Sequence, residues 1–465
     1  MACPVVLLIS PPVLYAQSWW SGRVASKPHL HSLSGFIRDI AEVRLLELDL
    51  TTVVEEGVDA MLAAVDRDLN VDGVDLVGIS CWTSLHYLGA LEVARRVRAL
   101  RPELPIVVGG HHPTAMPSDF VNEEALFDFV VRGDGESVLR RLCEERVARR
   151  AQAEVVRGAP YAMNDLSRID WDHYPWHDAE ARGLWLCLSR GCPFKCQYCA
   201  EPQRGSEWSH YPVKDALNVL ERLTKTHAPR VMAFADPLFG ANRPWTEALL
   251  DGIRALGLEN QFWCETRADL MTPALLDRLR EQRFKVDFGL DTGSATMARR
   301  MVKSPAPTSY LRRAREIIGH ANAIELPHDT YVLFNFPGET PETARESMEF
   351  VDGLAGTSGP ASGWISSQTF FILPGTEVYQ RMDEYRERYG TEIRNPTWWR
   401  ETRDHNALAT DILPSEAFRG REDELLAFKP WQQDVNVRRT ERYSPATFTF
   451  LREFYRTGPA LEPVG

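Results

Sequence analysis

The run Ser189-Arg-Gly-Cys-Pro-Phe-Lys-Cys-Gln-Tyr-Cys199 places three cysteines close together, with three residues between Cys192 and Cys196 and two between Cys196 and Cys199. Three thiolates can bind three irons of a [4Fe–4S] cluster and leave the fourth iron open to another ligand. A structural zinc site would need four ligands, usually in two pairs, and no second cysteine pair lies at a suitable spacing. A disulfide is disfavoured because three is an odd number. The run therefore predicts a cluster-binding loop.

Apolar strand candidates alternate with amphipathic helices from the residues just before this loop to the last quarter of the chain. This alternation predicts an α/β unit with a parallel sheet, in which functional loops follow the carboxyl ends of the strands. The cysteine loop follows the first of these strands. The six candidates are Leu184–Ser189, Arg230–Ala235, Gln261–Thr266, Phe284–Leu290, Thr330–Phe336 and Trp364–Ile372.

The residues before the loop repeat the pattern with five shorter strands, which predict a doubly wound parallel sheet of Rossmann-like type with the flavodoxin strand order. Ligands of such sheets bind beyond the carboxyl ends of the strands. The helix predicted over 84–100 carries Ala90, Val93, Ala94, Val97 and Leu100 on one face. The strand candidates are Val5–Ser10, Arg44–Leu50, Leu76–Ser80, Ile106–Gly110 and Phe127–Arg132.

The cysteine spacing, with aromatic Tyr198 before the third cysteine, resembles the signature of the radical S-adenosylmethionine (SAM) superfamily. The downstream β/α units resemble its partial (β/α)6 barrel. The upstream strand-end loops resemble the cobalamin-binding domain that precedes the barrel in many of these enzymes. The resemblance implies three cofactors: a [4Fe–4S] cluster on Cys192, Cys196 and Cys199, SAM, and cobalamin.

The resemblance also implies a SAM site on later strand ends. Asp236 would accept from the methionyl ammonium, Glu265 would bind a ribose hydroxyl and Arg267 the carboxylate. Two positions depart from the usual pattern: Asp291 stands where Glu is usual, and Asn335 where Gly is usual. Buried ion pairing, helix capping and turn formation explain the same residues without a ligand. The assigned set is Tyr198, Asp236, Glu265, Arg267, Asp291, Ser294, Asn335 and Gly338.

Cobalamin contacts are expected in the four upstream loops, where paired glycines allow close backbone approach and small hydroxyl side chains can bind a nucleotide tail. The chain has no Asp-x-His-x-x-Gly, so base-off cobalamin without a protein histidine ligand is expected. His111 or His112 as a lower ligand stays an alternative, and Ser80 has the alternative role of a helix cap. The assigned residues are Ser10, Pro11, Pro12, Ser80, Thr83, Ser84, Gly109, Gly110, His111, His112, Gly133 and Glu136.

Four segments are expected: a cobalamin-binding domain over 1–150, a linker over 151–182 whose aromatic run 169–176 packs the domains together, a radical SAM barrel over 183–376, and a mainly helical segment over 377–465. That last segment either caps the substrate pocket or is a packing appendage. Five other cysteines are interpreted as small buried hydrophobes: Cys3, Cys81, Cys143, Cys187 and Cys264.

The formal charge of −12 and the pI near 5.6 argue against a broad nucleic-acid or anionic-membrane footprint. The N-terminus lacks a basic region, and no apolar stretch reaches membrane-spanning length. We therefore expect a cytoplasmic enzyme. Its expected partners are a small-molecule or peptide substrate and an external low-potential electron donor of flavodoxin or ferredoxin type.

The resemblance implies a C-methyltransferase that uses methylcobalamin and a 5′-deoxyadenosyl radical on a natural-product or peptide biosynthetic intermediate. Cyclisation, ring contraction or rearrangement without methyl transfer is the first alternative. A tRNA methylthiotransferase is a second, in which Cys3, Cys81 and Cys143 would hold another cluster; the acidic charge and the Gly109–Pro117 loop speak against it. A non-catalytic cobalamin or SAM sensor is a third, disfavoured by the intact cysteine motif.

Overall fold

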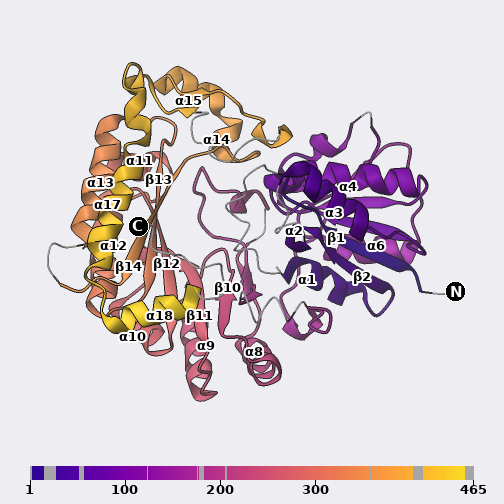
Figure 1. Ribbon diagram of the computed structural model, residues 1–465, viewed down its shortest axis with the longest axis horizontal. Helices are drawn as coiled ribbons and strands as arrows, with labels where there is room; N and C mark the ends of the chain where they lie inside the picture. The colour runs from indigo at the N-terminus through magenta and orange to yellow at the C-terminus, as the bar shows by residue number, and fades with distance from the viewer. Residues whose placement is uncertain are drawn as a thin grey trace.

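In the computed structural model, the N-terminal third of the chain forms an α/β unit of its own (Figure 1). Its sheet has six parallel strands in the order β2-β1-β3-β4-β5-β6, so the predicted flavodoxin order is confirmed. The structure describes residues 3–14, 28–51, 57–122, 124–174, 176, 183–204, 207–355, 359–401 and 412–455. The strands are β1 (Val5–Ser10), β2 (Glu42–Glu47), β3 (Leu76–Ser80), β4 (Ile106–Gly109), β5 (Phe129–Arg132) and β6 (Glu154–Arg157).

Two strands of this sheet differ from the expectation. β2 begins two residues earlier than predicted and ends at Glu47, because the chain turns into helix α2 (Leu48–Thr51) at Leu48. The sequence pattern does not predict β6, since Glu154-Val-Val-Arg157 is short and carries a charge at each end. It lies within the predicted linker range and pairs in parallel with β5 from Phe129↔Glu154 to Arg132↔Arg157.

Helices cover both faces of this sheet, which explains why β1 is a continuous apolar run rather than an alternating one. Leu7 and Ile9 pack in one core cluster, and Val6 and Leu8 pack in another. Leu100 does not join the buried face of α4, because it is the last helical residue and is 58% exposed. The helices are α1 (Pro28–Ile37), α3 (Val58–Asp68), α4 (Tyr87–Leu100), α5 (His111–Ala115) and α6 (Glu136–Glu145).

A second parallel sheet of six strands follows in strict sequence order, β7-β10-β11-β12-β13-β14, and leaves β7 and β14 as its edges. This is the order expected of the partial barrel. The strands are β7 (Leu184–Leu186), β10 (Val231–Phe234), β11 (Gln261–Thr266), β12 (Phe284–Asp291), β13 (His328–Phe334) and β14 (Gly363–Thr369). The helices between them are α8 (Val213–His227), α9 (Arg243–Ala255), α10 (Pro273–Glu281), α11 (Ala295–Arg300), α12 (Pro307–Ala323) and α13 (Pro341–Ala355).

The strand predicted over 184–189 ends early, at Leu186, and the chain then re-pairs in a separate two-residue strand. That strand, β8 (Ser189–Arg190), runs antiparallel to β9 (Ser209–His210). The cysteine loop lies between β8 and β9, so both of its ends are tied together by this short ladder.

The C-terminal part is mainly helical, as expected, and it covers the barrel. Asn436 of α17 (Phe428–Thr440) exchanges two 2.8 Å hydrogen bonds with the backbone of Ile365, which satisfies edge strand β14. α18 (Pro445–Tyr455) lies at the end of the barrel opposite the cysteine loop, where the Tyr455 hydroxyl donates to Asp329 at 3.5 Å. The remaining elements are α14 (Glu377–Gln380), α15 (Met382–Tyr389), β15 (Glu392–Ile393) and β16 (Ile412–Leu413).

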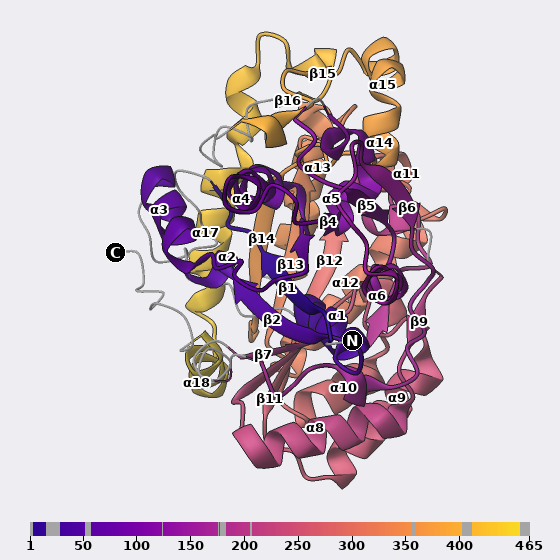
Figure 2. The ribbon, with the colours of Figure 1, turned by 90° about the vertical axis from the view of Figure 1, so that its right-hand side faces the viewer.

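The aromatic run of the predicted linker packs against both halves. Asp170 accepts a 2.5 Å hydrogen bond from Ser34 of α1, while the ring of Trp176 stacks on His227 of α8 at 3.5 Å. Figure 2, which looks along the line joining the two units, shows the N-terminal sheet lying in front of the barrel strands. In the described part of the chain, no helix combines the length and the apolar character that a membrane crossing requires.

Candidate active site

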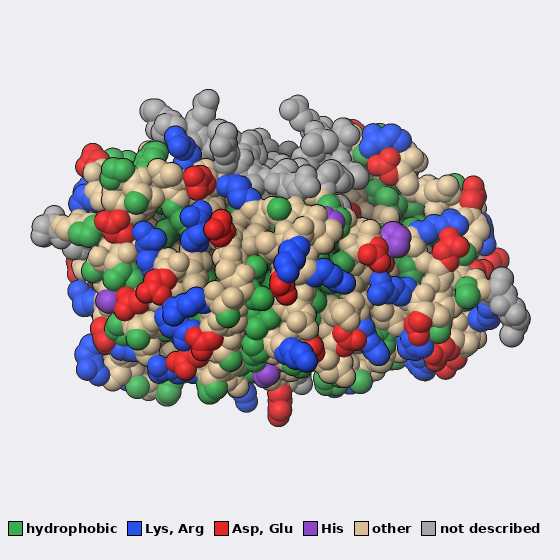
Figure 3. Space-filling model, turned by 90° about the horizontal axis from the view of Figure 1, so that it is seen from below, with side chains coloured by type: hydrophobic (Ala, Val, Ile, Leu, Met, Phe, Trp, Pro, Cys, Tyr) green, Lys and Arg blue, Asp and Glu red, His purple; other side chains and the backbone are tan. Residues whose placement is uncertain are grey.

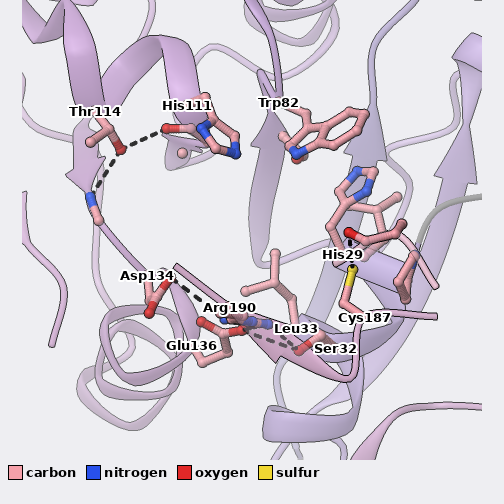
Figure 4. A pocket seen from close by; sticks show the side chains of 18 of the residues that line it. His29, Ser32, Leu33, Trp82, His111, Thr114, Asp134, Glu136, Cys187 and Arg190 are labelled. Atoms are coloured by element: carbon pink, nitrogen blue, oxygen red, sulfur yellow. Dashed lines mark hydrogen bonds and ion pairs between the residues drawn. The ribbon is translucent and has the colours of Figure 1, made fainter. Parts of the chain in front are cut away.

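A cavity of about 450 Å³ lies between the two units, and strand ends from both open onto it. The N-terminal unit contributes the carboxyl ends of β3, β4 and β5 and the start of α1. The barrel contributes β7, β10 and β11, including Trp185, Ala235 and Trp263. This is the position that parallel sheets give to their ligands. Figure 4 shows side chains from both units pointing into the same space.

The cysteine loop is half-buried and is anchored through its middle residue. Gln197 N donates to Met301 O at 3.1 Å, and Gln197 O accepts from Val378 N at 3.3 Å. The Gln197 side chain accepts from the hydroxyl of Tyr385 at 2.5 Å. These bonds tie the loop to the barrel and to the C-terminal segment. The three cysteines themselves form no disulfide.

Arg267, at the carboxyl end of β11, reaches the cysteine loop. Its Nη1 lies 3.8 Å from Cys196 Sγ, and its guanidinium stacks 3.8 Å over the ring of Phe194. Asp269 holds the guanidinium with two parallel 2.9 Å bonds, and Lys303 O accepts a third at 2.8 Å. The fold thus brings Arg267, a predicted SAM residue, into contact with Cys196, a predicted cluster ligand. The Nε and Nη2 groups of Arg267 already donate to the carboxylate of Asp269.

Tyr198 and Asp291, both assigned to SAM from the resemblance, bind each other. The Tyr198 hydroxyl donates to Asp291, whose same carboxyl oxygen pairs with the buried ammonium of Lys303. Burial, reinforced by the negative charge of Asp291, raises the pKa of Tyr198. Asp291 adopts a left-handed backbone with φ of 63° at the end of β12, and the register with β13 shifts there. The structure gives these two side chains a partner within the chain.

Asp236 lies at the end of β10, lines the cavity and supports the start of the cysteine loop. Its carboxylate accepts from Leu188 N and from the Ser189 hydroxyl, both at 2.7 Å. Burial raises its pKa to about 6, against the lowering effect of these two bonds. Asp236, which the sequence assigns to SAM, therefore also connects the end of β10 to the residues that follow β7.

Glu265 projects from β11 into the same cavity, and its carboxylate makes no hydrogen bond or ion pair with the residues that the structure describes. Its side chain is exposed, and it lines the cavity. Desolvation, with the nearby charge of Asp287, raises the pKa of Glu265 to about 7. The alternative of a buried Glu265–Arg267 ion pair is not what the structure shows, because Arg267 pairs with Asp269 instead.

The remaining predicted SAM residues have structural partners. Ser294 caps α11 and donates to Glu346 at 2.5 Å. The Asn335 amide donates to Thr369 Oγ1 at 3.1 Å and to Leu425 O at 2.9 Å. Gly338 has a φ of 85°, and a Cβ there would lie 2.9 Å from Arg300. None of the three lines the cavity between the units.

Six of the predicted cobalamin residues line the cavity: Ser80, Gly109, Gly110, His111, Gly133 and Glu136. A second cavity of about 210 Å³, adjoining the first at Trp82 and His111, is lined by Thr83, Ser84 and His112. Ser10, Pro11 and Pro12 line neither. Pro12 packs under α4, where a Cβ on Gly89 would lie 2.0 Å from Pro12 O.

The two adjacent histidines have different environments. His112 is buried, with Nδ1 2.8 Å from Ser84 Oγ and Nε2 3.1 Å from Asp119, so both ring nitrogens have protein partners. Burial lowers the pKa of His112 despite Asp119. His111 instead borders both cavities and lies 3.8 Å from Glu201. The predicted cobalamin contact of His112 would therefore compete with these two partners.

Gly110 serves the packing of neighbouring loops. Its φ is +123°, and a Cβ there would lie 2.3 Å from Cys81 O, so no larger residue fits between the β3 and β4 loops. Gly109 has no such conflict and faces the cavity. Of the predicted pair, Gly109 is the glycine that leaves room on the ligand side.

Arg190 is a cavity residue that the sequence analysis does not identify. It lies two residues before Cys192, and its guanidinium reaches Glu136 at 2.7 Å, Asp134 at 3.5 Å and Ser32 at 3.2 Å (Figure 4). It also stacks 4.4 Å over Tyr161. An arginine beside the cysteine motif, together with two acids in the Gly133–Glu136 turn, is the available signal, but only the fold shows that they meet.

The other cysteines do not form a second cluster site. Cys81 and Cys143 lie in separate hydrophobic clusters, on opposite faces of the N-terminal sheet. Cys3 is exposed and Cys187 half-buried, so the expectation that these five are buried holds for Cys81, Cys143 and Cys264 only. Among the described residues, no group of three or more His, Cys, Asp or Glu is arranged around a single metal ion. A [4Fe–4S] cluster differs from such a site, because each thiolate binds its own iron.

The residues present fit the implied cofactors. The three free thiols share one anchored loop beside a guanidinium. Burial, with the charges of Glu201, Cys196 and Cys192, raises the pKa of Cys199 to about 12. The cavity beside them is lined by the loops that follow β4 and β5, which contribute Gly109 and Gly133.

Comparison with known proteins finds two families along the chain. A family described as B12 binding domain matches residues 26–143, and the Radical SAM superfamily matches residues 186–351. An uncharacterized methyltransferase of Pyrococcus horikoshii is 22% identical over 370 residues, which cover 75% of this chain and 78% of that protein. The anaerobic magnesium-protoporphyrin IX monomethyl ester cyclase of Synechocystis is 26% identical over 278 residues, covering 54% of each.

Among solved structures, the radical SAM methyltransferase TsrM of Kitasatospora setae, with tryptophan substrate and a SAM analogue bound, has the same fold. Its TM-score is 0.69 at 17% identity, and the match covers 91% of this chain and 88% of that one. The two family matches in this order, on the fold described above, show that the chain belongs to the radical SAM enzymes with an N-terminal B12-binding domain, whose cofactors are a [4Fe–4S] cluster, SAM and cobalamin.

Proposed function

We propose that this enzyme is a C-methyltransferase that acts on a small-molecule or peptide biosynthetic intermediate. The observation that carries the proposal is the shared cavity of about 450 Å³, because strand ends of the B12-binding unit and of the barrel open onto it together. A methyl donor bound by one unit and a radical generated by the other can then act on the same substrate. The similarity to a methyltransferase over 75% of the chain supports this.

Cys192, Cys196 and Cys199 would hold the cluster. Their loop is fixed by three hydrogen bonds at Gln197, so the ligands do not have to be ordered when the cluster binds. The guanidinium of Arg267 lies 3.8 Å from Cys196 Sγ and would stand beside this cluster ligand. Asp236 holds the strand end that leads into the loop.

Gly109, His111 and Gly133 would contact the corrin at the carboxyl ends of β4 and β5, since they line the cavity on the side of the N-terminal sheet. When bound, the cofactors supply one-electron chemistry at the cluster and a transferable methyl group at the corrin. The chain's own contribution is to orient these groups and to exclude water, for which the apolar walls of the cavity, including Trp82, Trp185 and Trp263, are suited. Electrons would come from a separate low-potential donor protein.

Cyclisation or rearrangement without methyl transfer is the second candidate. It is favoured by the match to the magnesium-protoporphyrin IX monomethyl ester cyclase, which is more similar in identity but covers only 54% of the chain. The two candidates differ in the product, because methyl transfer adds the mass of one methylene and the second candidate does not.

The proposal is tested by cofactor content and product mass. Protein purified without oxygen from cells supplied with cobalamin should contain about four irons and one base-off corrinoid per chain. Cys196→Ala should lose the cluster and all SAM turnover. The matched control is Cys3→Ala, because Cys3 is an exposed cysteine outside the loop, and it should keep both.

A Cys196→Ala protein that still cleaves SAM would contradict the assignment of the cluster to these three cysteines. A wild-type protein with a full cluster and no corrinoid would contradict methyl transfer and favour the second candidate. The iron assay and the corrinoid spectrum are independent, so the two parts of the proposal can fail separately.

A further inference from the structure

The side-chain carboxylate of Glu265 has no hydrogen bond or ion pair with the described residues, and it lines the cavity. It follows Trp263 by two residues on β11, so both side chains project from the same face of the strand. Both line the cavity between the units. Trp263 donates from Nε1 to Asp287 at 2.7 Å, which fixes its ring, whereas the carboxyl of Glu265 is left to the cavity.

The cations nearest to this carboxylate are already neutralised. Beneath Trp263, the buried ammonium of Lys285 binds Asp287 and, at 3.0 Å, Asp329. Tyr331 donates to Asp287 at 3.0 Å, which completes the network. Because two carboxylates share its one charge, Lys285 cannot compensate Glu265 as well.

The cavity itself offers no uncompensated arginine or lysine. Among the described residues that line it, Arg190 is the one side chain of either type, and Asp134 and Glu136 hold its guanidinium. Arg267, on the same strand as Glu265, pairs with Asp269 on the side of the cysteine loop. Among the described lining residues, no arginine or lysine is therefore left to pair with Glu265.

Aromatic rings form the surface next to Glu265. Trp185 of β7 and Trp263 of β11 lie 5.4 Å apart, centroid to centroid, with an interplanar angle of 45°, and both line the cavity. A carboxylate beside tryptophan rings is the usual composition of a site for an organic ammonium, because the ring faces and the carboxylate all attract the cation.

We propose that the substrate carries a protonated amine and that Glu265, with Trp185 and Trp263, binds this ammonium group at the barrel wall of the cavity. This inference rests on the proposed function, because it names the substrate class of the same cavity. It assigns Glu265 to the substrate rather than to the SAM ribose. Desolvation and the charge of Asp287 raise the pKa of Glu265 to about 7 against the lowering effect of Lys285, and a bound ammonium would favour the charged carboxylate.

The test is equilibrium binding to the holoenzyme, reconstituted with cluster and cobalamin and saturated with SAM, without reductant so that no turnover occurs. Three probes of similar shape are compared by calorimetry at pH 8: 2-phenylethylammonium, 2-phenylethanol and 3-phenylpropanoate. We expect the ammonium to bind about tenfold more tightly than the alcohol, and the carboxylate to bind most weakly. Glu265→Gln should abolish this preference, and Glu265→Asp should keep most of it.

SAM affinity and corrinoid content are measured on the same variants and should stay within about twofold of wild type, the range of a substitution that leaves a site intact. Equal binding of the three probes to the wild type overturns the proposal. So does a Glu265→Gln protein that keeps the preference, or one that loses SAM affinity about tenfold while keeping the preference, since Glu265 would then bind the ribose. Loss of cluster or corrinoid in the wild type would instead overturn the proposed function.

Discussion

His328 illustrates how burial sets the charge state of a single residue. Its ring packs on Gly363, where a Cβ would lie 2.1 Å from Nε2, and its Nδ1 lies 2.9 Å from Leu326 O. Burial, helped by the positive charge of Arg439, lowers the pKa of His328 to about 3. In the unfolded chain, the histidine pKa is near 6.5. Between this pH and about pH 3, His328 therefore binds a proton in the unfolded chain but not in the folded protein.

We predict that this residue makes folding less stable in acid. Its contribution is full above pH 6.5 and falls as the pH drops from there towards 3, by about 1.4 kcal/mol between pH 7.5 and pH 5.5. His328→Asn removes the titration and keeps an amide that can donate to the Leu326 carbonyl. Chemical denaturation at the two pH values should show a smaller acid loss for the variant. Asp329, whose pKa is raised to about 6 mainly by burial, is present in both proteins, so it cancels in the comparison. Identical pH dependence of the two would contradict the assignment.

At the residue scale, the sequence predicts local chemistry better than long-range partners. The spacing of Cys192, Cys196 and Cys199 lies within one loop and is visible directly. The contacts of Asp291 with Lys303 and Tyr198 cannot be predicted from the sequence. Tyr198 and Asp291, for example, lie 93 positions apart in the chain. The same holds for Arg190, whose two acidic partners lie in the other unit.

At the element scale, the strands buried on both faces can be predicted, because a continuous apolar run between turns is a strong signal. The bounds predicted for β1, β3 and β11 are those observed. β6 escapes prediction, because the Glu154-Val-Val-Arg157 run belongs to a sheet edge and only its pairing with β5 defines it. Helix capping and turn formation account for Ser294 and Gly338, in line with the structural alternatives to ligand binding.

The connection between β10 and the cysteine loop gives a prediction about elements. Asp236 accepts from Leu188 N and Ser189 Oγ. An asparagine can still accept from the backbone amide and donate to the serine hydroxyl, whereas an alanine leaves a buried amide unpaired, at a cost of about 1–3 kcal/mol. The unpaired amide in Asp236→Ala should loosen the cysteine loop. We therefore expect Asp236→Ala to retain less than about half of the wild-type iron after gel filtration, and Asp236→Asn to retain most of it.

Iron and SAM affinity together separate this supporting role from the predicted contact with the methionyl ammonium. If Asp236 also binds the ammonium, Asp236→Asn keeps its iron but binds SAM more weakly. Full iron retention by Asp236→Ala would show that the two hydrogen bonds do not hold the loop.

At the scale of the whole molecule, the two units must keep their strand ends facing one cavity. On the face seen in Figure 3, basic and acidic side chains are interspersed and form no patch of a single sign. An ion-pair contact between largely buried side chains joins the two units at the cavity. Arg190, two residues from the first cysteine, binds Glu136 and Asp134 of the B12-binding unit, so one guanidinium couples the cluster loop to the turn after β5.

We predict that Arg190→Gln destabilises the protein and lowers its corrinoid content while leaving iron unchanged. The substitution removes the guanidinium that Glu136 and Asp134 share, and breaking such a buried pair typically costs about 3–5 kcal/mol. Glu136→Gln should be less harmful, since Asp134 still faces the arginine. The double variant should lose less free energy of unfolding than the two single variants lose together. The difference, measured by chemical denaturation, should be about 1–3 kcal/mol. Additive losses, or full corrinoid retention by Arg190→Gln, would show that the units are held together elsewhere, for instance by the stacking of Trp176 on His227.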